Sequence, residues 1–438
     1  MLSSSVAFDS QDPPWAQIPA RAGVFALFAT DERAEPYISR TPNLRHRLRR
    51  LLAARPSEQP GQSKRLRLTQ SVARIEYTLT GSDFESWLLL YEASLAAFGE
   101  RARKRLHLRP PAFLRMTMDN AYPRVYVTNR ITKSAANDLF GPFPSRVAAE
   151  TFLEGMLNLF ELRRCHEDLH PDPAFPGCIY SELKKCMAPC FKGCTDERYA
   201  QEAAAVYAFL ATRGQSLVAE LTRQRTQASE ALDFEKAAEI HSRLGRVEAA
   251  VAGVSPAVHA LAELTGVIVQ PAGEPEHVAL FLLTRGRLTG PALYSVAGMR
   301  HPNEQSGSSS LFAHPTAIAP VPLEDTPLVR LAVRDELESR LDNTLQSLQA
   351  VSAATAQQTV DHLCLFSRWY HRPQARRVGE AIFVESTRGE SHGEIPRKPL
   401  LRAISRVYRQ GQSSTEQRAE DTSGVENLPA EYGPPVEK

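Results

Sequence analysis

Hydrophobic positions in the N-terminal part of the chain alternate between short runs and helix-like spacing. The runs Val24 to Phe28, Tyr37 to Ile38 and Arg74 to Leu79 predict β-strands. A basic helix is predicted from Asn43, and an amphipathic helix from about Asp83 to Phe98. These elements predict a small α/β module.

Two further strands are predicted within residues 112–134, on either side of a turn at Asp119 and Asn120. The run Phe140 to Ser145 contains a glycine and two prolines, so we expect it to break the chain before a helix that Ser145 caps. The apolar stripe of that helix is Val147, Ala148, Phe152, Met156 and Leu159.

Residues 202–252 have almost no Gly or Pro and many helix-forming residues, which predicts an antiparallel pair of helices. Two strands are predicted at 278–283 and 292–296, on either side of a turn at 285–287, and a helix is predicted at 335–352. We therefore expect residues 255–410 to form a separate α/β module. The polar tail 411–438 cannot offset the entropy of ordering and is predicted to be disordered.

The chain has 438 residues, enough for two to four compact modules, and we predict a multidomain α/β protein. We see neither an apolar run long enough to span a membrane nor an N-terminal leader, and therefore expect a soluble cytoplasmic protein. The net charge is only +2, but residues 45–109 hold fourteen Lys or Arg against six Asp or Glu. That segment is either a phosphate-binding surface or a set of solvated helix faces.

Five of the six cysteines fall between Cys165 and Cys194, whereas Cys364 stands alone and is expected to be a buried small hydrophobe. The cluster is too sparse for a disulfide scaffold. Four thiolates on a loop-rich segment suit an iron–sulfur cluster or a tetrahedral zinc, and unliganded thiols are the remaining alternative. The absence of a Cys-x-x-Cys pair weakens zinc.

The chain resembles the UvrC family of excinucleases, the incision proteins of bacterial nucleotide excision repair, in several motifs that occur in order. They are the runs 140–145, Leu159 to Cys165, Cys178 to Tyr180 and Cys186 to Cys190. The resemblance implies that Cys165, Cys178, Cys186 and Cys190 ligate a 4Fe-4S cluster. Cys194 would then be a spare thiol.

Residues 232–238 resemble the UVR motif, through which members of that family dock on the excision-repair protein UvrB. By that resemblance the partner interface includes Phe234, Glu235 and Ala238, with Phe234 as the aromatic anchor. Periodicity by itself indicates only a helix hairpin.

The N-terminal module resembles a GIY-YIG nuclease in the runs 23–25 and 37–39. This implies Tyr37 and Arg47 as catalytic residues, Glu92 as the ligand of Mg or Mn, and a DNA-binding set of Arg40, Arg45, Arg49 and Arg50. Phe25 replaces the first tyrosine of the family, Leu51 replaces another tyrosine, and Ser39 replaces a glycine. A weakened site is therefore expected, because one hydroxyl of the proton-relay pair is missing.

The resemblance covers roughly residues 15–250 and leaves the C-terminal part without an RNase H-like carboxylate cluster or helix-hairpin-helix motifs. We assign no role to His362, His371 and His392. We expect a GIY-YIG-like nuclease module at 15–100 and a linker with the cysteine cluster at 101–198. A helical UVR-like domain at 199–254, an α/β module of uncertain fold at 255–410 and the tail at 411–438 follow.

Two functions fit this organisation, and both belong to nucleotide excision repair. The first is a weak metal-dependent endonuclease that nicks DNA beside lesions. The second is a non-catalytic adapter that binds DNA and a UvrB-like partner. Whether the chain is an enzyme depends on the residues around Tyr37.

Overall fold

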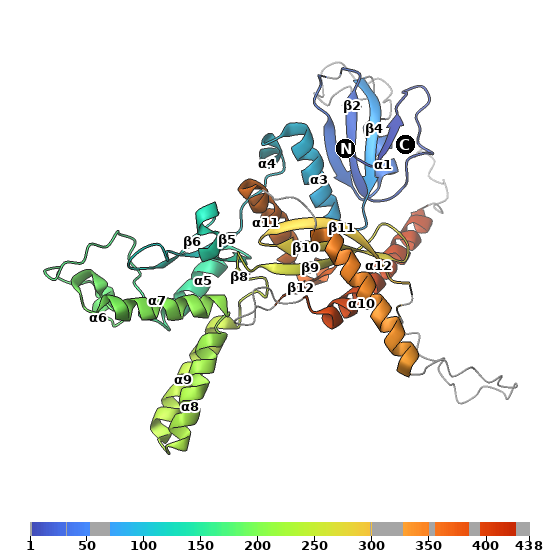
Figure 1. The fold of residues 1–438 in the computed structure, drawn as a ribbon. Coiled ribbons are helices and arrows are strands. Elements are labelled where there is room, and N and C mark those ends of the chain that lie inside the picture. The colour runs from blue at the N-terminus through green and yellow to red at the C-terminus, as the bar shows by residue number, and fades with distance from the viewer. Residues whose placement is uncertain are drawn as a thin grey trace, which may run out of the picture.

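The computed structural model describes residues 2–31, 33–52, 71–297, 299, 327–349, 355–384 and 395–425. Its described strands form three antiparallel sheets, and helices cover them (Figure 1). The predicted loop at residues 56–63 lies outside the described residues. Among the helices that are described, none is long and apolar enough to cross a membrane.

The N-terminal sheet has the strand order β1-β4-β2-β3 and a helix on each face. Its elements are β1 (Ser4–Ala7), β2 (Gly23–Ala29), β3 (Tyr37–Thr41), α1 (Leu44–Leu52), β4 (Val72–Leu79), α3 (Asp83–Phe98) and α4 (Arg101–Arg105). Alternation along β2 explains the two faces. Phe25 and Leu27 pack against α1, whereas Val24 and Ala26 pack with Leu90 of α3. The predicted strands and both helices are confirmed here.

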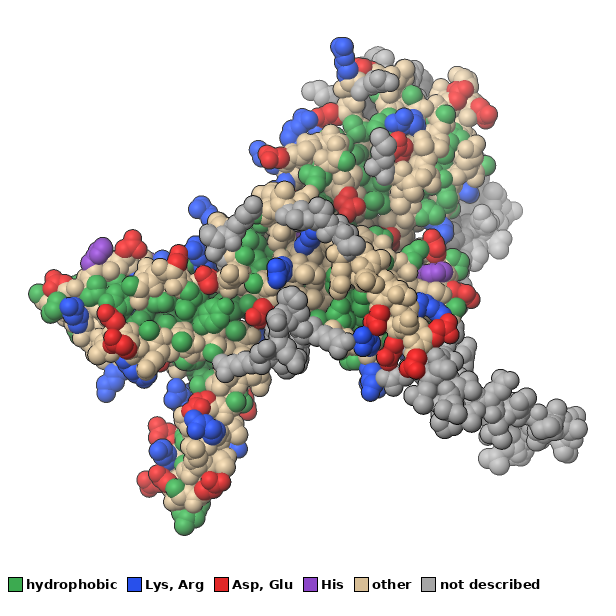
Figure 2. Space-filling view, viewed as in Figure 1, with side chains coloured by type: hydrophobic (Ala, Val, Ile, Leu, Met, Phe, Trp, Pro, Cys, Tyr) green, Lys and Arg blue, Asp and Glu red, His purple; other side chains and the backbone are tan. Residues whose placement is uncertain are grey.

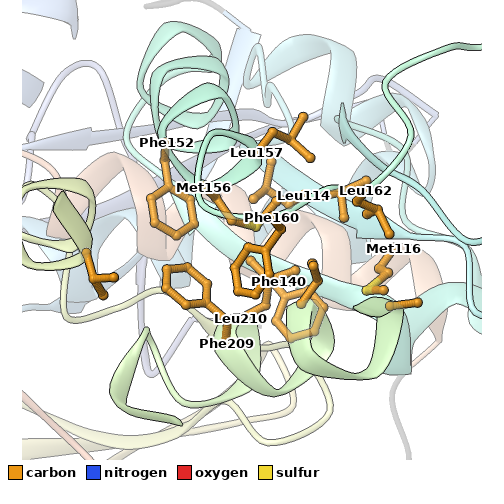
Figure 3. Packing of buried hydrophobic residues seen from close by; sticks show 14 of the residues in the cluster. Leu114, Met116, Phe140, Phe152, Met156, Leu157, Phe160, Leu162, Phe209 and Leu210 are labelled. Atoms are coloured by element: carbon orange, nitrogen blue, oxygen red, sulfur yellow. The ribbon is translucent and has the colours of Figure 1, made fainter. Parts of the chain in front are cut away.

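The middle sheet has the order β6-β5-β7-β8. Its elements and the helices that follow are β5 (Ala112–Met116), β6 (Val125–Thr128), η1 (Lys133–Asp138), β7 (Leu139–Phe143), α5 (Arg146–Leu157), α6 (Ile179–Glu182), η2 (Pro189–Phe191), α7 (Asp196–Ala211), α8 (Gln215–Glu230), α9 (Phe234–Val251) and β8 (His259–Ala260). Figure 3 shows its core, in which Phe152, Phe160 and Phe209 come from α5, the following loop and α7.

The expectation that residues 140–145 break the chain is wrong for 140–143, which form β7 in the middle of this sheet. Gly141 and Pro142 of β7 together lie opposite Phe113 of β5, as in a β-bulge, so the missing N–H of Pro142 falls where the ladder is interrupted. Gly141 fits because a Cβ there would lie 2.5 Å from the Phe113 ring.

Helix α5 begins as predicted, because the Ser145 side chain accepts a hydrogen bond from Ala148 N. Its stripe is shifted, however, since Val147 is 70% exposed and Ala149 is buried instead. Residues 202–252 contain three helices rather than two. Helix α7 belongs to the middle core, and the antiparallel pair is α8 and α9, which project together away from the sheets (Figure 1).

The C-terminal sheet has the order β11-β10-β9-β12. Its elements are β9 (Thr265–Pro271), β10 (His277–Thr284), β11 (Arg287–Ser295), α10 (Pro327–Gln349), α11 (Ala356–Tyr370), η3 (Gln374–Arg376), β12 (Glu380–Phe383) and α12 (Arg397–Val425). Helices α10 and α12 cover one face, and α11 covers the other together with Phe84, Leu88 and Tyr91 of α3.

Helix α3 therefore belongs to two cores, one on each of its sides. The predicted hairpin of β10 and β11 is confirmed, as is the burial of Cys364. The tail prediction is wrong for residues 411–425, which continue α12, and residues 426–438 lie outside the described part.

Candidate functional site

The end of the α8–α9 hairpin carries the predicted partner-binding residues. Phe234 is 66% exposed and Leu232, in the turn, is 72% exposed, while Glu235 and Ala238 are exposed beside them. Figure 2 shows hydrophobic side chains at this free end. The Asp233 side chain caps α9 by accepting a hydrogen bond from Lys236 N at 3.1 Å. The buried interior of the hairpin contains Ala228, Ile240, Leu244 and Val247.

The four candidate ligand cysteines are free and half-buried, and their thiols are near enough to interact electrostatically. Burial raises the pKa of the Cys186 thiol to about 11, and the nearby Cys165, Cys178 and Cys190 add to this rise. The Ala188 N–H opposes it by donating to Cys186 Sγ at 3.3 Å. Within the described ranges, no three His, Cys, Asp or Glu side chains are arranged as a metal site. The four thiols are thus neighbours without a formed ligand geometry.

Arg163 lies beside these thiols and is only 1% exposed. Its guanidinium donates to the carbonyl oxygens of Tyr122 and Glu167, each at 2.8 Å, and lies 3.7 Å from Cys165 Sγ. A buried guanidinium next to a group of thiols favours a negative charge there. Sequence reasoning missed Arg163, although its position two residues before a candidate ligand was a signal.

The N-terminal module places its predicted catalytic residues on two faces of one sheet. Tyr37 packs its ring 6.1 Å from the ring of Phe25 on the face of α1, the helix that also holds half-buried Arg47. Glu92 lies on α3, which covers the opposite face. Its side chain is exposed, although desolvation by the surrounding atoms still raises the pKa of the carboxyl.

The four predicted DNA-binding arginines are in different situations. Arg40 is ion-paired with Asp83 and lies 4.3 Å from the Trp87 ring, so it serves the contact with α3. Arg45 donates through Nε to Ile18 O at 2.7 Å. Arg49 lies 5.9 Å from the Trp15 ring, and both Arg49 and Arg50 are exposed.

Asp83 and Trp87 of α3 also contact α11 and the residues that follow it. Arg372 pairs with Asp83 at 2.7 Å, and the Arg368 guanidinium lies 4.4 Å from the Trp87 ring. Tyr91 donates a hydrogen bond to Asp361 at 3.2 Å, and Arg103 also contacts Asp361. These contacts hold α3 and α11 together.

Fold and sites define a multidomain α/β protein with a cysteine-rich segment and a projecting helical hairpin. Residues 112–209 match the family described as UvrC/Cho excinuclease, middle domain, and residues 215–250 match the UvrB/uvrC motif. The first match contains the cysteine segment and the second is the α8–α9 hairpin. In these residues the chain is similar to the UvrC family.

Similar curated proteins include UvrABC system protein C of Ectopseudomonas mendocina, which is 30% identical over 301 residues, 65% of this chain and 46% of the relative. The protein of the same name from Kocuria rhizophila is 30% identical over 55% of this chain and 34% of its own length. That from Rickettsia bellii is 28% identical over 52% and 34%. The chain thus spans between a third and about half of these relatives. No solved structure gives a significant match.

Proposed function

We propose that this protein is a DNA-binding component of nucleotide excision repair that docks on UvrB through the α8–α9 hairpin. The observation that carries the proposal is the exposure of Leu232 and Phe234 at the free end of a hairpin that matches the UvrB/uvrC motif. Large apolar side chains placed together on a projecting end are typical of a protein interface.

The backbone at this end supports an interface over a purely structural turn. Leu232 has a φ of +58°, a left-handed conformation that costs a non-glycine residue about 1–2 kcal/mol. The same side chain remains in water, where it contributes little to folding. Leu232 thus has an unfavourable backbone conformation and an apolar side chain in water, and binding to a partner explains this residue better than folding stability does.

Isothermal titration calorimetry of the full chain with purified UvrB tests the docking. Phe234→Ala should weaken binding by about 2 kcal/mol or more, roughly thirtyfold, because a buried aromatic anchor is lost. Val147→Ala is the matched control, since Val147 is equally exposed but lies on α5. If the unmodified protein does not bind, the docking proposal fails.

The cysteine segment is proposed to hold a 4Fe-4S cluster on Cys165, Cys178, Cys186 and Cys190. Three observations support the fit: the proximity of the thiols, the N–H donated to Cys186 Sγ, and the buried cation of Arg163. The cluster would supply a structural cross-link for a segment with little regular structure. Anaerobic purification should give brown protein, and a colourless protein with one zinc per chain would contradict the cluster.

Weak metal-dependent nicking of DNA is the second candidate. Tyr37 and Arg47 support it because β3 and α1 lie on the same side of the module, where a base and a cation for the developing charge are both needed. Glu92 would hold Mg or Mn. Phe25 supplies no hydroxyl beside Tyr37, and Glu92 lies on the helix that covers the opposite face of the sheet, so the adapter function is the better supported of the two.

A further inference from the structure

Residues 101–130 form a strongly basic stretch of the chain. It contains a single acidic residue, Asp119, and eight basic residues: Arg101, Arg103, Lys104, Arg105, Arg109, Arg115, Arg124 and Arg130. The whole chain carries only +2, so this charge is concentrated here. A density of this kind is typical of surfaces that bind phosphates.

Part of the charge is used inside the molecule. Arg101 and Arg105 are ion-paired with Glu35, and Arg103 contacts Asp361 at 3.2 Å. These three arginines fix α4 against the rest of the protein. They explain the basic composition of α4 but not that of the strands after it.

Arg115 of β5 and Arg124, which directly precedes β6, lie on one face of these two strands. Val125 and Val127 point into the middle core, so Arg124 and Tyr126 lie on the other face of β6. Arg115 is the cross-strand partner of Tyr126 and donates to its hydroxyl at 3.3 Å. The Arg124 guanidinium lies 4.8 Å from the centre of the Tyr126 ring.

Exposed arginines extend this face at one end. Asn129 donates to Pro110 O at 3.0 Å, which places exposed Arg130 beside the loop of exposed Arg109. At the other end, Arg124 Nη1 lies 2.7 Å from His166 Nδ1. The run from residue 124 to residue 130, which includes β6, spans at most about 20 Å at about 3.3 Å per residue. That length follows roughly half a turn of a DNA duplex.

Charges on an edge strand also protect a sheet from pairing with another chain, and β6 is the edge strand of its sheet. Edge protection requires neither charge of one sign nor an aromatic ring held among guanidiniums. Arg124 contacts Tyr126 and His166, neither of which is an anion. Phosphate recognition explains all of these features together.

We propose that the basic ribbon, defined as Arg109, Arg115, Arg124, Tyr126 and Arg130, binds the sugar–phosphate backbone of duplex DNA. The inference rests on the proposed function and assigns its DNA contact to the middle domain rather than to the arginines of α1. Guanidiniums contact the phosphate oxygens, and the ribbon therefore binds without a strong preference for sequence.

Fluorescence anisotropy of the full chain with a labelled 30-base-pair duplex, measured across salt concentrations, tests the ribbon. The triple variant Arg109→Gln, Arg124→Gln, Arg130→Gln should reduce the slope of log K against log salt by about 2.7, since each lost phosphate contact removes about 0.9. The control triple Arg146→Gln, Arg223→Gln, Arg246→Gln removes the same charge from exposed positions on α5 and the hairpin. It should leave the slope within about 0.5.

Two single variants keep the test decisive if the triple variant is unstable. Asp119 lies 3.8 Å from Arg115, so Asp119→Asn removes a negative charge beside the ribbon and should tighten DNA binding. Arg124→Lys keeps the positive charge and should retain most of the salt dependence. Equal losses in both triple variants would overturn the ribbon and leave DNA binding in place. If the triple variant of the ribbon keeps the DNA slope of the unmodified chain but no longer binds polyglutamate, the ribbon would instead bind an acidic protein partner. Failure of the unmodified chain to bind any duplex would overturn the proposed DNA function itself.

Discussion

The α8–α9 hairpin, which matches the UvrB/uvrC motif, and the N-terminal module, whose sequence resembles a GIY-YIG nuclease, display their candidate residues differently. In the hairpin, Phe234 and Leu232 are exposed at a free end and depend only on two helices and a turn. In the N-terminal module, Tyr37 lies on the face of the sheet that α1 covers, exposed Glu92 lies on α3 over the opposite face, and Arg40 is ion-paired with Asp83. A docking surface needs only local structure, whereas catalysis needs groups that converge from several elements.

The two regions also differ in how they join the rest of the protein. The hairpin is attached mainly through contacts of α9 with α5 and of α8 with α7. Helix α3 is instead inserted between the N-terminal and C-terminal sheets. Changes in the hairpin should therefore affect binding, and changes in α3 should affect the stability of two modules at once.

The largest expected effect is that of Phe84→Ala on thermal unfolding. Phe84 is 2% exposed and lies 5.1 Å and 5.0 Å from the rings of Phe281 and Trp369. The variant should lose about 3–5 kcal/mol of the free energy of unfolding, because a large cavity opens between two modules. Phe234→Ala should change it by less than about 0.5 kcal/mol. Similar losses in both variants would contradict the contrast between the hairpin and α3.

Hydrolysis provides the next effect, in a nicking assay on lesion-containing duplex with Mg or Mn. Any activity should fall about a hundredfold or more in Arg47→Ala, which removes the proposed charge-stabilising cation, or in Glu92→Gln, which removes the proposed metal ligand. Arg146→Ala on α5 is the control. Full DNA binding without nicking, and no gain in Phe25→Tyr with Leu51→Tyr, would decide for the adapter.

Acid should weaken the junction of α3 and α11 by a smaller amount. Burial lowers the pKa of His362 from 6.5 to about 4, and the charge of Arg287 adds to this. The unfolded chain then binds more protons than the folded chain between these pH values, so stability is present above pH 6.5 and is lost as the pH falls. Between about pH 7 and about pH 5 the loss should be about 2 kcal/mol.

Chemical denaturation at both pH values measures this loss. His362→Asn is the control, because Asn can still accept the hydrogen bond from Leu288 N that His362 Nδ1 accepts at 3.1 Å. Its stability should vary less across the same interval. An identical pH dependence in both proteins would show that other groups are responsible.

The smallest effect concerns the helix cap of the hairpin. Asp233→Ala removes the acceptor for Lys236 N and should destabilise the start of α9 by about 1 kcal/mol. Hydrogen exchange should become faster in the first turn of α9, and docking should weaken only modestly. Ser145→Ala removes the equivalent cap of α5, and there the faster exchange should be confined to α5.

Local sequence signals were sufficient to predict an element wherever its structure depends on residues close to one another in the chain. The cap at Ser145, the helix Asp83–Phe98 and the hairpin of β10 and β11 were predicted correctly, because capping and periodicity act over a few residues. The motif of the α8–α9 hairpin belongs to the same class. Its exposed end follows from the order of residues along two adjacent helices.

Tertiary structure decided the features that depend on distant segments. Phe140 to Phe143 form a strand in which an irregularity at Gly141 and Pro142, opposite Phe113 of β5, accommodates the proline. The pattern of α3 could not reveal that both of its sides are covered. The separation of Tyr37 from Glu92 likewise follows from which face of the sheet each helix covers. Sequence spacing determines which side of an element a residue occupies, but packing between elements determines what that side meets.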